Sequence, residues 1–141
     1  MEFLQIDIKK LIPQREPMIM VERVIAADEG TVTTALQITT DNLFCSEGQF
    51  SEEGLVENIA QSAAAMSGLT AHRDGTPVKR GFIGSIRGLK VRERPTVGSE
   101  IITTVELIGK VLNVDMVRGV VKLEGRVVAE CEMRIFLEDQ V

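Results

Sequence analysis

Gly54 to Ala71 reads GLVENIAQSAAAMSGLTA, a run of small and apolar residues in which Glu57 is the single ionisable side chain. A surface helix shows a charged face to water, so a helix of this composition must be buried on nearly every side. The run therefore predicts a central helix that the rest of the chain has to cover. It also predicts an unpaired carboxylate at Glu57, and a buried charge without a partner is costly enough to suggest a chemical role.

The flanking residues predict where this helix begins and ends. Ser51 suits the N-cap position, and Glu52 and Glu53 suit the positive end of the helix dipole. His72 to Gly75, with Pro77 beyond, is typical of a helix end. The face expected to press on a sheet carries Leu55, Ile59, Ser62, Met66 and Leu69. The opposite face, suited to close approach by a backbone, a subunit or a ligand, carries Glu57, Gln61, Ala64 and Gly68.

Strand patterns lie on both sides of the helix. Met18 to Ala27 and Thr31 to Thr40 predict a hairpin, and Asp41 to Phe50 predicts a loop. Long strands are predicted after the helix over Gly81 to Arg92, Glu100 to Leu112, Val114 to Leu123 and Arg126 to Leu137. This order predicts a single α+β domain over residues 1–141, in which a curved antiparallel sheet of about six strands wraps the long central helix.

Composition narrows the function classes. A net charge of −5 and the absence of Trp and Tyr argue against nucleic acid as the main partner. No apolar run is long enough to span a membrane, and the N-terminus lacks an export signal, so we expect a cytoplasmic protein. One histidine and two cysteines without CxxC spacing predict no metal site. No sequence feature calls for a cofactor, and Cys45 is expected to be a spectator thiol.

Six segments match one family's motifs in order. Residues 11–24 (LIPQREPMIMVERV) look like LLPHRYPFLLVDRV, residues 48–50 (GQF) stand at a GHF position, and residues 57–61 (ENIAQ) match EAMAQ. Residues 81–86 and 94–99 look like FAGID and RPVVPGD, and residues 124–130 look like DGEVVAEA. Over nearly its full length the chain thus resembles the β-hydroxyacyl-(acyl carrier protein) dehydratases of fatty acid synthesis. That resemblance implies the hotdog fold.

The resemblance also implies an active site. In that family the GHF histidine and the helix glutamate, from different subunits of a dimer, share the acid and base work of removing water from a β-hydroxyacyl thioester. Carried over, the catalytic positions are Glu57 and Gln49, and the backbone N–H groups of Gly54-Leu55 would polarise the thioester carbonyl. The implied substrate-binding residues are Gly48, Phe50, Gly54, Leu55 and Gln61.

Two departures from the family pattern bear on activity. Gln49 replaces the histidine, and an amide neither takes nor gives a proton near neutral pH. The connection from Phe50 to Glu57 is also shorter than the family's FPGNPIMPGVLIVE stretch. His72 follows Glu57 by fifteen residues, roughly 22 Å along a helix at about 1.5 Å per residue, so it does not replace the missing group within one chain.

Three functions remain open. The first is a dehydratase that either uses Glu57 in an altered mechanism or takes its histidine from a second hotdog subunit. The second is a thioesterase that uses Glu57 and Gln49, as some hotdog thioesterases do. The third is a noncatalytic acyl-binding subunit. The implied partners are an acyl-(acyl carrier protein) or acyl-coenzyme A, within a homodimer, a heterodimer with another hotdog subunit, or a higher oligomer.

A basic cluster is the candidate docking surface for the acidic carrier protein or for the phosphates of coenzyme A. The alternative is a solvated strand face. The cluster comprises Lys79, Arg80, Arg87, Lys90, Arg92 and Arg94.

Overall fold

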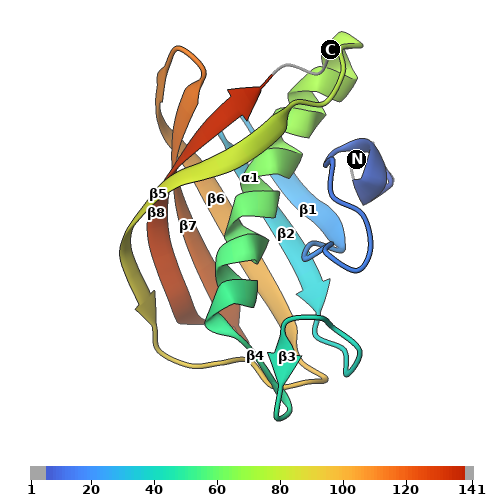
Figure 1. Cartoon of the computed structure of the whole chain (residues 1–141), viewed down its shortest axis with the longest axis vertical. Helices are drawn as coiled ribbons and strands as arrows, with labels where there is room; N and C mark the ends of the chain where they lie inside the picture. The colour runs from blue at the N-terminus through green and yellow to red at the C-terminus, as the bar shows by residue number, and fades with distance from the viewer. Residues whose placement is uncertain (1–5, 139–141) are drawn as a thin grey trace.

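A computed structural model of the chain, which describes residues 6–138, consists of one long helix packed against a six-stranded antiparallel sheet (Figure 1). The sheet has the order β1-β2-β6-β7-β8-β5. Its strands are β1 (Arg23–Asp28), β2 (Thr31–Gln37), β5 (Arg80–Val91), β6 (Glu100–Val111), β7 (Val114–Leu123) and β8 (Arg126–Glu138). This is the predicted α+β hotdog architecture, with α1 (Glu52–Asp74) in the concavity of the sheet.

The ends of α1 agree with the sequence signals. Ser51 is the N-cap, and its hydroxyl accepts a hydrogen bond from the Gly54 N–H at 3.1 Å. Gly75 ends the helix in the left-handed conformation, with a φ of 70°. The prediction that the helix is buried on most sides is confirmed, because ten of its residues, spread from Gly54 to Ala71, are buried.

The segment before β1 differs from the prediction. β1 begins at Arg23 rather than Met18, because the backbone around Met18 and Met20 hydrogen-bonds to side chains of α1 instead of to a strand. The segment starts with the short 3-10 helix η2 (Ile8–Lys10), and Figure 1 shows it in blue beside α1. The predicted loop before the helix contains a two-residue pair of strands, β3 (Cys45–Ser46) and β4 (Gln49–Phe50).

Buried polar side chains fix how α1 sits on the sheet. Thr34 of β2 hydrogen-bonds to Ser62 at 2.8 Å, and Thr103 of β6 donates to the Asn58 side-chain oxygen at 2.5 Å. The Asn58 amide donates in turn to the Met20 carbonyl at 2.7 Å. Because a buried polar group without a partner is costly, sliding or rotating the helix would break several bonds at once. The polar groups thus specify one arrangement of an otherwise apolar interface.

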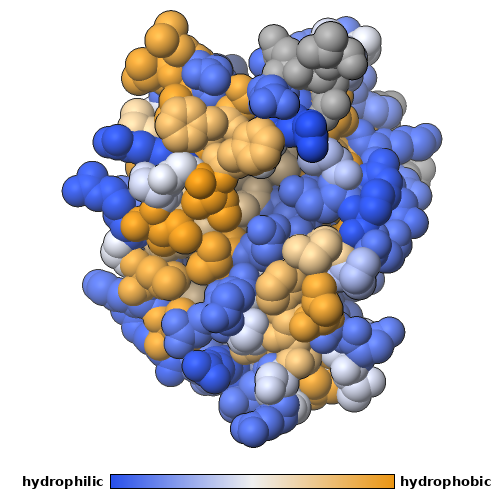
Figure 2. Space-filling view, viewed as in Figure 1, coloured by the Kyte–Doolittle hydropathy of each residue, from blue (hydrophilic) through white to orange (hydrophobic). Residues whose placement is uncertain are grey.

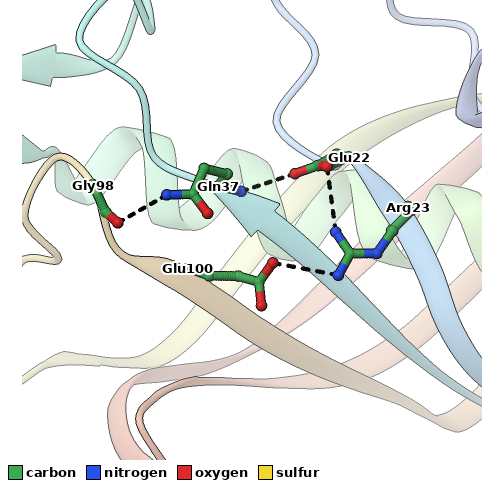
Figure 3. Close-up of polar contacts among 5 residues, drawn as sticks. All are labelled: Glu22, Arg23, Gln37, Gly98 and Glu100. Carbon is green, nitrogen blue, oxygen red and sulfur yellow. Dashed lines mark hydrogen bonds and ion pairs between the residues drawn. The ribbon is translucent and has the colours of Figure 1, made fainter.

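Exposed polar contacts join β1, β2 and the start of β6 at one end of the sheet (Figure 3). Gln37 donates its side-chain amide to the Gly98 carbonyl at 2.8 Å, and Arg23 bridges Glu22 and Glu100 at 3.3 Å each. Exposed ion pairs contribute about 0–1 kcal/mol each, so this end of the sheet depends mainly on its strand pairing. Within residues 6–138 no helix combines the length and hydropathy needed to cross a bilayer.

Gly68 lets the N-terminal segment pack directly on the helix backbone. A Cβ atom at this position would overlap the carbonyl group of Leu11, which is backbone and has no rotamer to move to. The Leu11 backbone thus covers part of the helix face for which the sequence predicted a backbone, a second subunit or a ligand as neighbour. The helix therefore receives this cover from its own chain.

We predict that Gly68→Ala lowers the free energy of unfolding by about 1–3 kcal/mol, as overpacking does. The sign is diagnostic, because an alanine in an unobstructed helix interior would instead stabilise by about 1 kcal/mol. Urea denaturation followed by circular dichroism measures the change, and Thr70→Ala on the exposed side of the same helix is the control. Equal or greater stability of the Gly68 variant would contradict the packing described.

Candidate active site

Glu57 is a partly buried carboxylate held by one neighbour on its own helix. Its Oε2 accepts a hydrogen bond from the Gln61 side-chain amide at 2.7 Å, one turn further along α1. The expectation of an unpaired carboxylate is therefore wrong. The i, i+4 spacing places the two side chains on the same helix face. Because the amide is a donor that carries no charge, it orients the carboxylate without forming an ion pair.

Gln61 itself is fully buried and uses both ends of its amide. Its Oε1 accepts the Met20 N–H at 2.6 Å, and its Nε2 donates to the Met18 carbonyl at 2.7 Å as well as to Glu57. The Met20 group at this position is an N–H, which can only donate, so the oxygen of the Gln61 amide must point toward it. The N–H side of Gln61 is consequently fixed toward Glu57. The N-terminal segment, α1 and the candidate catalytic carboxylate are thus joined through one side chain.

A cavity of about 240 Å³ opens beside Glu57, between α1 and the β5–β8 side of the sheet. The helix side of its wall is made of small residues, and a small residue leaves room where a large one would fill it. The opposite side comes from the start of β5, the end of β8 and Asp115 of β7. The lining residues are Gln14, Glu57, Ala60, Ala63, Ala64, Ser67, Lys79, Gly81, Phe82, Ile83, Asp115, Ile135 and Leu137.

Charge in the cavity wall is partly balanced. Asp115 pairs with Lys110 at 2.7 Å, and 14% of its side chain is exposed. Glu57 has the neutral amide of Gln61 as its partner. The cavity therefore presents an oriented carboxylate beside a mainly apolar lining. Such a combination suits a small-molecule ligand that has an apolar tail and one reactive end.

Gln49 lies outside this cavity in the single chain. It is exposed on β4, pairs with Ser46 of β3, and forms an isolated bridge with Thr96. Gly48, next to it, is exposed and has a φ of 77°. Because Gln49 does not line the cavity beside Glu57 in the single chain, its expected catalytic role stays a prediction.

The remaining predicted substrate-binding residues lie in the core. Phe50 and Leu55 are fully buried, and the ring of Phe50 packs so closely on Gly54 that a Cβ there would clash with it. The Gly54 N–H donates to the Ser51 hydroxyl and the Leu55 N–H to the Ser51 carbonyl, at 3.1 Å each. Both expected carbonyl donors thus serve the helix cap here, and their role toward a substrate stays a prediction.

The basic cluster runs along β5 and just beyond it, where acidic residues oppose it. Arg80 pairs with Glu138 at 3.9 Å, Arg92 with Glu130 at 2.7 Å, and Arg94 with Glu52 at 3.4 Å. The hydrogen bond from Arg92 lowers the pKa of Glu130 below its usual value. Arg87 and Lys90 stand opposite Glu132 and Glu130 in the β5–β8 register, and Lys79 lines the cavity.

His72 and the two cysteines do not line the cavity beside Glu57. His72 is exposed in the last turn of α1. Burial raises the pKa of the Cys45 thiol, and it raises that of Cys131 to about 11, so both stay protonated at neutral pH and are poor nucleophiles. The described residues contain no group of three or more His, Cys, Asp or Glu side chains arranged to hold a metal ion.

β5 is an edge strand with apolar side chains exposed along it. Phe82 is 50% exposed, and Ile83, Ile86 and Leu89 are each about 40% exposed. Figure 2 shows hydrophobic side chains gathered on the β5–β8 side of this face. An unprotected edge strand with exposed apolar residues is a surface that proteins usually cover.

Comparison with known proteins agrees with this architecture. Residues 6–141 match the ApeP-like family, described as ApeP dehydratase. The chain belongs to the ApeP-like dehydratase family. It is 28% identical to the 3-hydroxyacyl-[acyl-carrier-protein] dehydratase FabZ of Anaeromyxobacter dehalogenans, over 96% of this chain and 90% of that protein. It is 30% identical to the protein of the same name from Clostridium botulinum, over 94% of each chain.

Solved structures share the fold at low sequence identity. The dehydratase heterocomplex ApeI:P from Xenorhabdus doucetiae superposes with a TM-score of 0.89 at 17% identity, over 96% of this chain and 93% of that chain. A hypothetical thioesterase from Streptococcus pneumoniae has a TM-score of 0.64 at 12% identity, over 84% of this chain and 91% of that chain. The chain is a divergent hotdog dehydratase-family member related to FabZ.

Sequence reasoning missed several residues of the cavity wall. Gly81, Phe82 and Ile83 were recognised as a motif match without a role, and Gln14 as one letter of the opening motif. At Gln14, as at Gln49, the chain has glutamine where the family motif has histidine. This replacement of histidine by glutamine at both positions was the sequence signal that could have pointed to Gln14. Burial of the Gln14 Oε1 atom becomes visible only in the folded chain.

We predict that Gln61→Leu lowers the free energy of unfolding by about 2–4 kcal/mol, because the Met20 N–H and the Met18 carbonyl lose their partners. Thermal and urea denaturation measure the loss. Gln37→Leu is the matched control, since Gln37 is an exposed glutamine whose amide also bonds to a backbone carbonyl, and it should change stability by at most about 0.5 kcal/mol. Similar losses in the two variants would show that Gln61 does not tie the segment to the helix.

Proposed function

We propose that this chain is a subunit of an acyl-thioester dehydratase in which Glu57 transfers a proton and a second hotdog subunit completes the site with a histidine. The observation that carries the proposal is the Glu57 carboxylate, oriented by Gln61 at the wall of a mainly apolar cavity. A carboxylate in that setting is a candidate general acid or base. The similarity to the FabZ relatives, which are 3-hydroxyacyl-[acyl-carrier-protein] dehydratases, supports the reaction class.

The chemistry needs two titrating groups. Dehydration of a 3-hydroxyacyl thioester removes a proton from the carbon next to the carbonyl and adds a proton to the hydroxyl, which leaves as water. Glu57 supplies one of these groups. Gln49 is an amide and does not titrate, and the one histidine of the sequence, His72, lies at the far end of the helix. A second subunit is therefore the source of the missing group, and the likeness in fold to the dehydratase heterocomplex ApeI:P supports such a pairing.

The surface we assign to this partner is the open edge of β5. A strand added there would pair with its free backbone groups and cover Phe82, Ile83 and Ile86. The same edge borders the cavity, because Gly81, Phe82 and Ile83 line both. A subunit at β5 is thus close enough to contribute residues to the site. The basic residues along β5 remain our proposed docking surface for the carrier protein or coenzyme A.

The thioesterase and the noncatalytic subunit remain alternatives that one assay separates. The purified chain, alone and together with a second hotdog protein encoded beside it, is offered a 3-hydroxyacyl and a saturated acyl thioester. Enoyl thioester from the mixture alone supports the proposal. Free acid and thiol would support hydrolysis instead, and binding without turnover in every mixture would support the noncatalytic subunit.

We predict that Glu57→Gln lowers the dehydration rate of the active complex about 10²–10⁴-fold while leaving the fold intact. The amide keeps the size of the side chain and loses proton transfer. Steady-state formation of enoyl thioester measures the rate, and circular dichroism checks the fold. Glu53→Gln, an exposed glutamate in the first turn of the same helix, is the control and should keep the parent rate. Full activity of the Glu57 variant would remove Glu57 from the mechanism.

A second variant tests the missing histidine. We predict that Gln49→His raises the dehydration rate of the chain without the second protein, through pairs of its own copies in which position 49 of one copy meets Glu57 of the other, because it restores a titrating side chain at the position where the family motif has one. The same enoyl-thioester assay measures the gain over the parent chain. An unchanged rate would mean that the shorter connection between Phe50 and Glu57 has moved position 49 away from the substrate.

A further inference from the structure

The cavity beside Glu57 follows the helix α1 for several turns. Glu57, Ala60, Ala64 and Ser67 line it from one turn to the next. The helix rises about 15 Å between Glu57 and Ser67, at roughly 1.5 Å per residue. A volume of about 240 Å³ spread over that length leaves room for one narrow chain. The candidate catalytic carboxylate stands at one end of this stretch.

The other end of the stretch lies at the start of β5. Figure 1 shows β5 crossing the C-terminal half of α1, and Gly81 of β5 lines the same cavity as Ser67. Leu137 of β8, the register partner of Gly81, is also part of the wall. The cavity thus runs from Glu57, in the N-terminal half of the helix, toward strands of the sheet.

The wall between these ends is largely apolar. The helix contributes three alanines, and the sheet contributes two isoleucines that are partners in the β5–β8 register; these residues are Ala60, Ala63, Ala64, Ile83 and Ile135. Their side chains offer no hydrogen-bonding groups. A pantetheine arm carries amides, which are costly to bury without partners, whereas an alkyl tail gains from every methylene that leaves water. The tail is therefore the part of an acyl thioester that matches this wall.

We propose that Ala64 and Ser67 are specificity-determining residues that set the length of the acyl chain accepted by the cavity. The tail lies along α1, from its reacting carbons at Glu57 toward the start of β5. The inference rests on the function proposed above and names the feature of the substrate that the cavity selects. A cavity of about 240 Å³ holds about eight groups of water size at roughly 30 Å³ each, so acyl chains of medium length fill it.

Binding measurements on the full chain test this inference. The probes are butyl, hexyl, octyl and dodecyl thioethers of pantetheine, which can be neither dehydrated nor hydrolysed, and titration calorimetry gives their dissociation constants. We expect the affinity to rise from butyl to octyl by up to about fourfold for each added methylene. From octyl to dodecyl it should level off, because the added methylenes find no further room.

Leucine variants at the two positions test the direction of the tail. Ala64→Leu should lower the affinity ratio of octyl to butyl at least about tenfold, because its added carbons take the place of methylenes of the tail. Ser67 lies further from Glu57, so Ser67→Leu should weaken octyl and spare hexyl, whereas Ala64→Leu should weaken both. Thr70→Leu, on the exposed side of the same helix and outside the cavity wall, is the control. Circular dichroism checks that each variant is folded.

Three results would overturn the inference. Equal weakening of butyl and octyl in the leucine variants would assign the cavity to the pantetheine arm that the probes share. Unchanged ratios in both variants, or failure of every probe to bind, would show that the cavity does not hold the tail. The thioethers report binding without chemistry, so none of these results decides whether the chain takes part in dehydration. Conversely, absence of enoyl thioester from every mixture would overturn the proposed function and leave the measured affinity ratios as they are.

Discussion

The Gln61 amide is the interaction on which the site depends. It is fully buried, and it bonds both to the backbone of the N-terminal segment at Met18 and Met20 and to the Glu57 carboxylate on its own helix. A single glutamine satisfies these groups because an amide has an acceptor end and a two-hydrogen donor end. The direction of the Glu57 side chain is therefore set by the same bonds that seat the N-terminal segment.

The central helix divides its circumference among three neighbours. Leu55, Ile59 and Ser62 face the sheet, and Gln61 and Gly68 lie under the N-terminal segment. The third face, with Ala60, Ala63 and Ala64, lines the cavity beside Glu57. Small side chains have two roles on this helix. They allow a backbone to approach closely on one side, and they leave empty volume on another. A longer side chain at these positions would fill the cavity or displace the segment.

Much of the architecture was predictable because it follows from local patterns. The caps at Ser51 and Gly75 set the helix ends, and alternation set the four long strands after it. The first strand was predicted too early because residues 18–20 have a strand-like composition, while the backbone groups of Met18 and Met20 bond to side chains of α1. No periodicity reveals a side chain that reaches 41 residues back along the sequence.

The candidate site was predictable only in part for the same reason. Glu57 stood out from its own helix, and the family motif pointed to it as well. Gln61 was expected only as a substrate-binding residue, and its two backbone partners come from another segment. Gln14 and the start of β5 enter the site through the fold alone, since the cavity is a property of distant segments meeting. The sequence therefore predicted a single candidate residue, Glu57. It did not predict the cavity or the hydrogen bonds that form when distant segments meet.

The location of the carboxylate weighs against a chain that serves only as cover for a partner. A cover subunit would be more stable with an apolar residue at position 57, because a partly buried carboxylate gives up hydration that a single neutral hydrogen bond does not replace. The helix instead holds the group in one direction, at a cavity that borders the open edge of β5. An oriented charge that lies next to a cavity and an uncovered strand edge is what our proposal expects of half an active site, whose other half would come from the subunit that covers the edge.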